Sequence, residues 1–116
     1  MAAGLKKSGY KNAHCKISLP NHKQFSNLHK ETIFRLTQEA LTNINKHARP
    51  KRIDISIQEN NKSIHMEFIN DGIVRNNKKT NGIGLLGMAE RVANLSGTIK
   101  SRTYKGIFII KILIPL

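Results

Sequence analysis

Residues 38–48 of the chain read QEALTNINKHA, and they continue an apolar periodicity that begins near residue 27. Apolar side chains recur there every three or four residues, which predicts one amphipathic helix from about residue 27 to residue 48. Proline disfavours helical geometry in the residue before it, so Arg49-Pro50 should end this helix. The predicted apolar face consists of Ile33, Leu36, Ala40, Ile44 and Ala48, joined by Phe34 and Leu41.

A polar stripe runs along the edge of this apolar face. At about 100° per residue, Glu39, Asn43 and Lys46 fall beside the apolar arc and should line the rim of a cleft. The amide oxygen of Asn43 is a hard ligand suited to Mg²⁺, an ion that usually keeps several waters and shares substrate phosphates. Lys46 and His47 can offset the charge of such phosphates. The alternative is an ordinary amphipathic helix with a solvated polar face.

Two glycine-containing segments supply further candidate residues. The turn Asn70-Asp71-Gly72 follows a predicted strand, so it places an amide and a carboxylate at the edge of the sheet, beside a glycine that permits close approach. The pair Gly82-x-Gly84 precedes a predicted helix, where free N–H groups and the positive helix end can bind phosphate. A plain Asx-Gly turn is the alternative for the first segment, and two glycines alone do not define the second.

The remaining sequence predicts a small α+β domain. Alternating apolar residues and turn signals predict five strands, at about residues 13–19, 53–58, 64–69, 98–103 and 107–114. A second amphipathic helix should span about residues 85–95, with Gly97 as a left-handed cap, and the last two strands should turn at Lys105-Gly106. We therefore expect one domain over residues 1–116, a two-layer sandwich of a mixed, mostly antiparallel sheet with both helices on one face.

The charge balance is strongly basic. Twenty Lys and Arg residues face seven Asp and Glu residues, which gives a formal net charge of +13 and a pI near 10.3. Such a charge can indicate nucleic-acid binding, but the basic residues are scattered and the aromatic residues do not interleave with them as stacking platforms would. The one cysteine, Cys15, can close no internal disulfide, so the chain is most simply intracellular.

The order of these segments resembles that of a known family. The chain carries QEALTN at 38–43, KHA at 46–48, GxGLxGMxER at 82–91 and SGT at 96–98. Together these segments resemble the N-box and second glycine box of NarL-type sensor histidine kinases in the GHKL superfamily, and the resemblance extends from about residue 19 to residue 115. It implies the Bergerat α/β sandwich, with ATP bound between the long helix and a short lid at about residues 73–81. We expect this lid to be disordered without nucleotide.

The resemblance also implies roles for residues at the phosphate end of the site. Asn43 would coordinate Mg²⁺, and Glu39 would position water or act as a base. Lys46 and His47 would approach the phosphates of ATP. The triphosphate would be held by the glycine box, which contains Gly82, Gly84, Leu85 and Gly87.

The adenine end departs from the family pattern. The family usually has Asp at the position of Asn70, so adenine would be bound either by Asn70 or by the adjacent Asp71, beside Gly72. Two further departures are Val74, where many members have glycine, and Ile107, where threonine often follows the glycine of the last turn. The identity of the residue that contacts adenine is therefore open at this point.

By this resemblance, the chain is the catalytic domain of a two-component sensor histidine kinase. It would donate the γ-phosphoryl group of ATP to a histidine on a separate dimerisation domain, for relay to a response regulator of the NarL/LuxR type. We expect a cytoplasmic domain, the C-terminal part of a membrane-anchored sensor, with no nucleic-acid partner. The alternatives are an anti-sigma-factor serine kinase of the same superfamily and a non-enzymatic basic module, whose DNA binding would fall steeply with salt.

Overall fold

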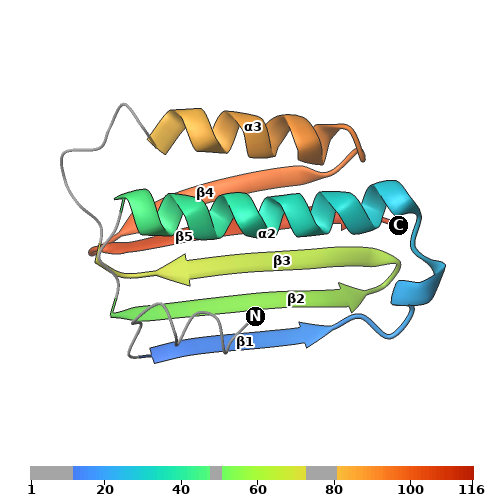
Figure 1. The fold of residues 1–116 in the computed structure, drawn as a ribbon, viewed down its shortest axis with the longest axis horizontal. Helices are drawn as coiled ribbons and strands as arrows, with labels where there is room; N and C mark the ends of the chain where they lie inside the picture. The colour runs from blue at the N-terminus through green and yellow to red at the C-terminus, as the bar shows by residue number, and fades with distance from the viewer. Residues whose placement is uncertain (1–11, 48–50, 73–80) are drawn as a thin grey trace.

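The predicted elements are all present in the computed structural model, which describes residues 12–47, 51–72 and 81–116 (Figure 1). Each boundary lies within two residues of its prediction, except the start of the second long helix. The predicted lid, apart from Asn81, lies outside the described residues. The elements are β1 (Asn12–Ser18), the 3₁₀ helix η1 (His22–Gln24), α2 (Asn27–His47), β2 (Arg52–Asn60), β3 (Ser63–Asn70), α3 (Asn81–Ala93), β4 (Thr98–Tyr104) and β5 (Ile107–Pro115).

The five strands form one mixed sheet in the order β1-β2-β3-β5-β4. β1 pairs with β2 in parallel, and each of the other neighbouring pairs is antiparallel. Both hairpins turn through two residues with positive φ, Asn61 and Lys62 before β3 and Lys105 and Gly106 before β5. Positive φ at both central residues is the type I′ geometry, whose twist matches that of the flanking strands. The predicted turn at Lys105-Gly106 is therefore confirmed, as is the mostly antiparallel sheet.

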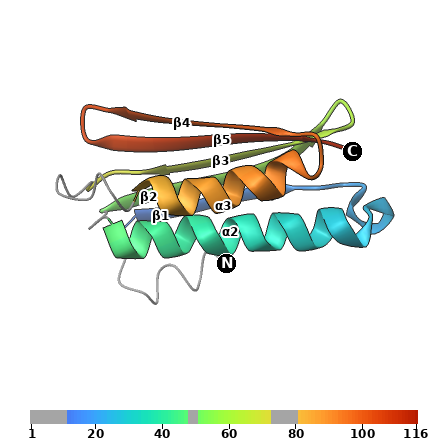
Figure 2. The same cartoon turned by 90° about the horizontal axis from the view of Figure 1, so that it is seen from above.

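Both long helices pack on the same face of the sheet, which gives the two layers seen in Figure 2. Residues at alternate positions of β2, β3 and β5 are buried under the helices, because successive side chains of a strand point to opposite faces. α2 covers them with Leu36, Ala40 and Ile44, while α3 contributes Met88 and Val92. These contacts confirm the predicted α+β sandwich. The buried strand residues include Ile53, Ile55, Ile57, Ile64, Met66, Phe68, Ile110, Ile112 and Ile114.

Two details of the helices differ from the prediction. Phe34 is 58% exposed rather than part of the apolar face, because it lies two residues, about 200°, around the helix from the fully buried Leu36. α3 begins at Asn81, four residues earlier than predicted, so Gly82 and Gly84 lie inside its first turn. The apolar pattern of α3 begins only at Leu85, and glycine has a low helix propensity, so the sequence pattern placed the boundary too late.

The end of α3 also differs from the prediction, which assigned a left-handed conformation to Gly97. Ser96 adopts the positive φ, 58°, and Gly97 instead donates its N–H to the Val92 carbonyl oxygen at 2.9 Å. Gly97 is needed for space. A Cβ atom there would lie 2.9 Å from Cγ1 of Val92 and even closer to the backbone carbonyl oxygen of Leu113 on β5.

Replacing Gly97 with alanine should therefore destabilise the fold. The Leu113 carbonyl belongs to a paired strand and cannot move aside cheaply, so we expect a loss of about 1–3 kcal/mol, the usual effect of overpacking. Thermal denaturation followed by circular dichroism should show a melting temperature lower by several degrees. The exposed Asn94, replaced by alanine, provides a control with little expected change. An unchanged melting temperature for Gly97→Ala would contradict this account of the helix end.

Candidate nucleotide site

Three separate segments that carry the candidate residues meet at one end of the sandwich. The C-terminal end of α2, the end of β3 and the start of α3 all lie on the left of Figure 1. α2 and β3 both run toward this end, and α3 begins there and runs back across the sheet (Figure 1). The topology thus brings together residues that lie far apart in the sequence, from α2, β3 and α3.

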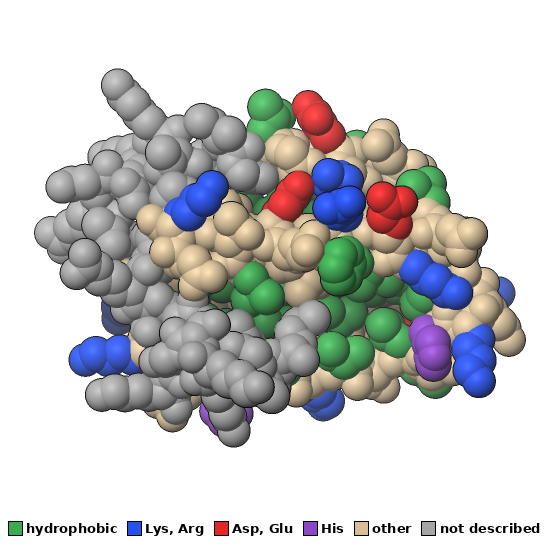
Figure 3. Space-filling model, in the orientation of Figure 1, with side chains coloured by type: hydrophobic (Ala, Val, Ile, Leu, Met, Phe, Trp, Pro, Cys, Tyr) green, Lys and Arg blue, Asp and Glu red, His purple; other side chains and the backbone are tan. Residues whose placement is uncertain are grey.

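α2 and α3 form the walls of an open groove of about 600 Å³. An ion pair joins the two walls, since Nε of Arg91 donates to Oε1 of Glu39 at 3.1 Å. Asn43 lies one helical turn from Glu39 and is half-buried, and its side chain makes no hydrogen bond to another described residue. Figure 3 shows this helical face, where acidic and basic side chains lie close together beside exposed apolar ones. The groove is lined by Arg35, Gln38, Glu39, Leu41, Thr42, Asn43, Gly87 and Arg91.

The second carboxylate oxygen of Glu39 is buried without a partner. Among the described residues, Oε2 is the one fully buried side-chain oxygen or nitrogen atom with no hydrogen bond. Gly87 of α3 is its neighbour. A Cβ atom added to Gly87 would lie 3.9 Å from Oε2. A buried acceptor without a donor is costly, so the atom is suited to a donor supplied by a bound molecule.

The turn at the end of β3 separates the two candidates for adenine recognition. Asn70 is 4% exposed and lies on the helix-covered face, where its Nδ2 donates to the Asp71 carbonyl oxygen at 2.9 Å. Asp71 Oδ1 instead accepts from the backbone N–H groups of Lys51 and Arg52, at 2.8 and 3.0 Å. Gly72 follows with φ of 71°. Asp71 therefore holds the start of β2, and Asn70 is the residue directed toward the helices.

The remaining candidates lie around the same end. Gly82 and Gly84 lie in the first turn of α3, whose N–H groups have no intrahelical partners, and the half-buried Leu85 packs against the core. Lys46 is exposed near the end of α2. His47 is the last residue of α2, and its side chain is outside the described part of the structure.

These residues fit a Mg²⁺-nucleotide. An amide oxygen of Asn43 and a carboxylate of Glu39 are hard oxygen donors on one stripe of α2. The start of α3 offers backbone N–H groups and a positive helix end to phosphate. Lys46 adds a positive charge near the same end.

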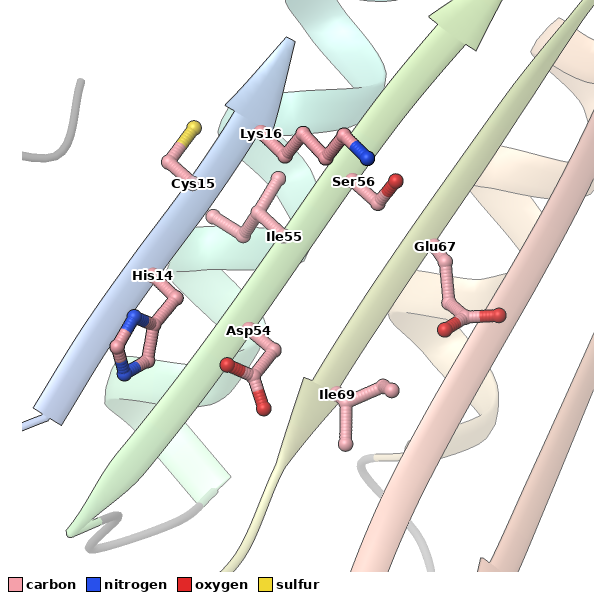
Figure 4. Close-up of a pocket in the computed structure, with 8 residues that line it drawn as sticks. All are labelled: His14, Cys15, Lys16, Asp54, Ile55, Ser56, Glu67 and Ile69. Atoms are coloured by element: carbon pink, nitrogen blue, oxygen red, sulfur yellow. The ribbon is translucent and has the colours of Figure 1, made fainter.

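A second hollow, of about 370 Å³, lies on the opposite, uncovered face of the sheet (Figure 4). Its polar side chains, which include Asp54 and Glu67, come from β1, β2 and β3. Both carboxylates already have cationic neighbours, because Asp54 accepts from Arg52 Nε at 2.9 Å and Glu67 lies 3.7 Å from Lys111 Nζ. None of the candidate site residues lines this hollow.

Two arginines that line the groove, Arg91 and Arg35, were not predicted from the sequence. Arg91 belongs to the GxGLxGMxER segment, and it lies four residues after Gly87, hence on the same side of α3. That spacing is the signal that could have directed attention to it. Arg35 precedes Glu39 by four residues on α2 and lines the same groove.

The sequence is similar to curated sensor kinases. No protein-family model matches the chain. It is 40% identical over 74 residues, 61% of its length, to the signal transduction histidine-protein kinase/phosphatase DegS of Brevibacillus brevis. It is 33% identical over 79 residues, 66% of its length, to the oxygen sensor histidine kinase NreB of Staphylococcus carnosus. The matches span only 19% and 23% of these two relatives, about a fifth of their length.

Solved structures share the fold at lower sequence identity. The histidine kinase domain of the blue-light activated kinase EL346 of Erythrobacter litoralis superimposes with a TM-score of 0.73 at 18% identity, covering 99% of this chain and 57% of that one. The catalytic domain of the histidine kinase ThkA gives a TM-score of 0.66 at 15% identity, covering 97% of this chain and 84% of that one.

The chain thus shares the fold of histidine kinase catalytic domains. In sequence, the chain is similar to sensor histidine kinases over 61–66% of its length. Within the described residues, neither α2 nor α3 is long and apolar enough to cross a membrane.

Proposed function

We propose that the chain binds ATP with Mg²⁺ where α2, β3 and α3 meet, and donates the γ-phosphoryl group to a histidine on a separate phosphoacceptor and dimerisation domain. The observation that best supports this proposal is the groove in which Glu39 and Asn43 of α2 face Gly87 of α3. Similarity to sensor histidine kinases supports the same assignment.

The phosphate end of the site would act mainly by positioning and charge neutralisation, which is what phosphoryl transfer requires of a protein. Asn43 would supply an oxygen ligand to Mg²⁺, which neutralises charge on the phosphates when it is bound. Backbone N–H groups in the first turn of α3 would hold phosphate oxygens, beside Gly82 and Gly84. Lys46 and His47 at the end of α2 would offset the remaining negative charge.

The adenine end would depend on Asn70 rather than Asp71. The Asp71 carboxylate already accepts two backbone N–H groups, whereas Asn70 lies on the helix-covered face of the sheet. Because the Asn70 Nδ2 donates to the Asp71 carbonyl oxygen, its Oδ1 is the atom suited to accept from the adenine amino group. Gly72 would let the base approach the backbone closely.

The proposal extends to the partners and setting of the chain. The phosphoryl group would pass from the phosphoacceptor histidine to a response regulator of the NarL/LuxR type. The domain would be cytoplasmic and would belong to a membrane-anchored sensor. The relatives are named as sensor histidine kinases, which favours this proposal over an anti-sigma-factor serine kinase and over a basic nucleic-acid-binding module.

The direct test of the transfer step is incubation with labelled ATP, with and without the phosphoacceptor domain as a separate polypeptide. We expect no labelling of the chain alone, because the kinases it resembles have an acidic residue after the acceptor histidine. With the acceptor domain, we expect acid-labile label on that domain. None of the histidines of this chain has an acidic residue after it, which is why the chain alone should not be labelled. The residues that follow them are Cys15, Lys23, Lys30, Ala48 and Met66.

The position of the label decides between the alternatives. Acid-stable phosphoserine on a partner protein would favour the anti-sigma-factor kinase. Efficient labelling of a histidine within the 116 residues alone would contradict the proposal. A variant with Asn43→Ala serves as the control for transfer that does not depend on the proposed site.

A further inference from the structure

The hairpin of β4 and β5 has an outer face that neither long helix covers. α2 and α3 pack on the other face of the sheet (Figure 2), and alternate residues of the two strands point away from them. These outward-pointing residues are called the hairpin face here. The hairpin, residues 98–115, contains four basic residues and no acidic one. The exposed basic and apolar members of the hairpin face are Lys100, Arg102, Tyr104, Ile107, Lys111 and Leu113.

The positive charge on this face is only partly balanced. Lys100 and Lys111 lie directly opposite each other on the two strands, and like charges in this position weaken strand pairing. Lys111 has the carboxylate of Glu67 at 3.7 Å, whereas Lys100 and Arg102 form no ion pair with a described residue. A hollow of about 410 Å³ opens beside Lys100 and Lys111. The face therefore offers both charge and space to an anionic group.

The tip of the hairpin is apolar as well as basic. Tyr104 and Ile107 are cross-strand neighbours on either side of the turn, and they are 52% and 40% exposed. The charged groups of Arg102 and Lys105 lie 5.2 and 5.3 Å from the centre of the Tyr104 ring. An exposed aromatic ring between cations suits the boundary of a lipid bilayer, where the ring meets apolar chains and the charged ends reach the phosphates.

We propose that the hairpin face docks on an anionic phospholipid membrane. Tyr104 and Ile107 enter the headgroup region, and the cations of β4 face the lipid phosphates. An acidic peptide added along the free edge of β4 would leave the exposed apolar residues of β5 uncovered, whereas a bilayer is broad enough to meet both strands. Each Lys or Arg near an anionic membrane adds about fivefold to affinity. Docking of this kind requires neither nucleotide nor the candidate nucleotide site.

Co-sedimentation with vesicles tests this proposal. We expect the chain to bind vesicles of phosphatidylcholine mixed with phosphatidylglycerol, to bind them less at high salt, and to leave vesicles of phosphatidylcholine alone unbound. Lys100→Glu combined with Arg102→Glu should weaken binding to the mixed vesicles by about tenfold or more. The charge-matched control combines Lys23→Glu with Lys30→Glu, two exposed lysines of η1 and α2. It should weaken binding by less than about threefold, because these lysines are not part of the hairpin face.

A fluorescence measurement gives a second test that does not depend on the charge-reversed pair folding. The chain contains no tryptophan, so Tyr104→Trp introduces a single tryptophan reporter at the tip of the hairpin. Its emission should shift to shorter wavelength with the mixed vesicles, and it should be protected from a water-soluble quencher. Neither change is expected with vesicles of phosphatidylcholine alone.

Three outcomes would overturn the membrane proposal. One is equal binding to the mixed vesicles by the wild type and by the variant with Lys100 and Arg102 reversed. Another is an equal loss in the control pair, which would mean that only the overall charge of the chain matters. The third is an unchanged emission of Tyr104→Trp on the mixed vesicles. If soluble polyglutamate instead shifts that emission, the hairpin face fits an acidic protein partner and not a membrane.

Discussion

Replacing Asn43 with alanine is expected to abolish the Mg²⁺ dependence of nucleotide binding while leaving the fold intact. The side chain makes no hydrogen bond to another described residue, and alanine is the better helix former, so α2 should not be weakened. For the wild type, we expect Mg²⁺ to tighten binding of a non-hydrolysable ATP analogue by about tenfold or more, about 1.4 kcal/mol. For the variant, titrations with and without Mg²⁺ should give the same Kd.

The control for this prediction is the exposed Asn94, beyond the end of α3, which also changes from asparagine to alanine. Its Mg²⁺ dependence should equal that of the wild type. If Asn43→Ala and the wild type show equal analogue affinity at every Mg²⁺ concentration, Asn43 is not the metal ligand.

Asn70 variants are expected to have the second large effect, on base recognition. Asn70→Ala removes the proposed acceptor for the adenine amino group and should weaken analogue binding by about tenfold, since a lost hydrogen bond to a buried group costs about 1–3 kcal/mol. Asn70→Asp keeps acceptor oxygens and should bind adenine equally or more tightly. It should also melt at a lower temperature, because it loses the bond donated to the Asp71 carbonyl oxygen.

Asp71→Ala is the matched comparison for Asn70. Asp71 accepts from the backbone N–H groups of Lys51 and Arg52, so its removal should affect the start of β2 and leave the preference for adenine over guanine unchanged. A large loss of affinity in Asn70→Asp, or a changed base preference in Asp71→Ala, would show that the base pocket is misplaced.

Periodicity predicted most of the fold because both kinds of element have one buried face. The alternation of apolar and polar residues predicted β2 and β3. In β3 every second residue is buried, and continuing this two-residue period past Phe68 places Asn70 on the same buried face as Ile64 and Met66. From the sequence, Asn70 and Asp71 remained alternatives because Asn70 stands where the family usually has Asp, with Asp71 next to it. The structure shows that β3 includes Asn70.

Features that depend on contacts between distant segments could not be predicted in this way. The Glu39–Arg91 ion pair joins residues 52 positions apart, and its formation depends on how α2 and α3 are rotated against each other. Gly97 was interpreted as a helix cap from its local position, but its role is set by close approach to Leu113 on β5. Neither contact is visible in the spacing of residues along one element.

The most direct test of the account is a calorimetric titration of the chain with a non-hydrolysable ATP analogue, repeated with and without Mg²⁺ and with the matching guanine analogue. We predict one binding site for the adenine analogue, tighter binding in the presence of Mg²⁺, and weaker binding of the guanine analogue. The absence of measurable binding under all of these conditions, by protein shown to be folded, would contradict the proposal that the meeting point of α2, β3 and α3 is a nucleotide site.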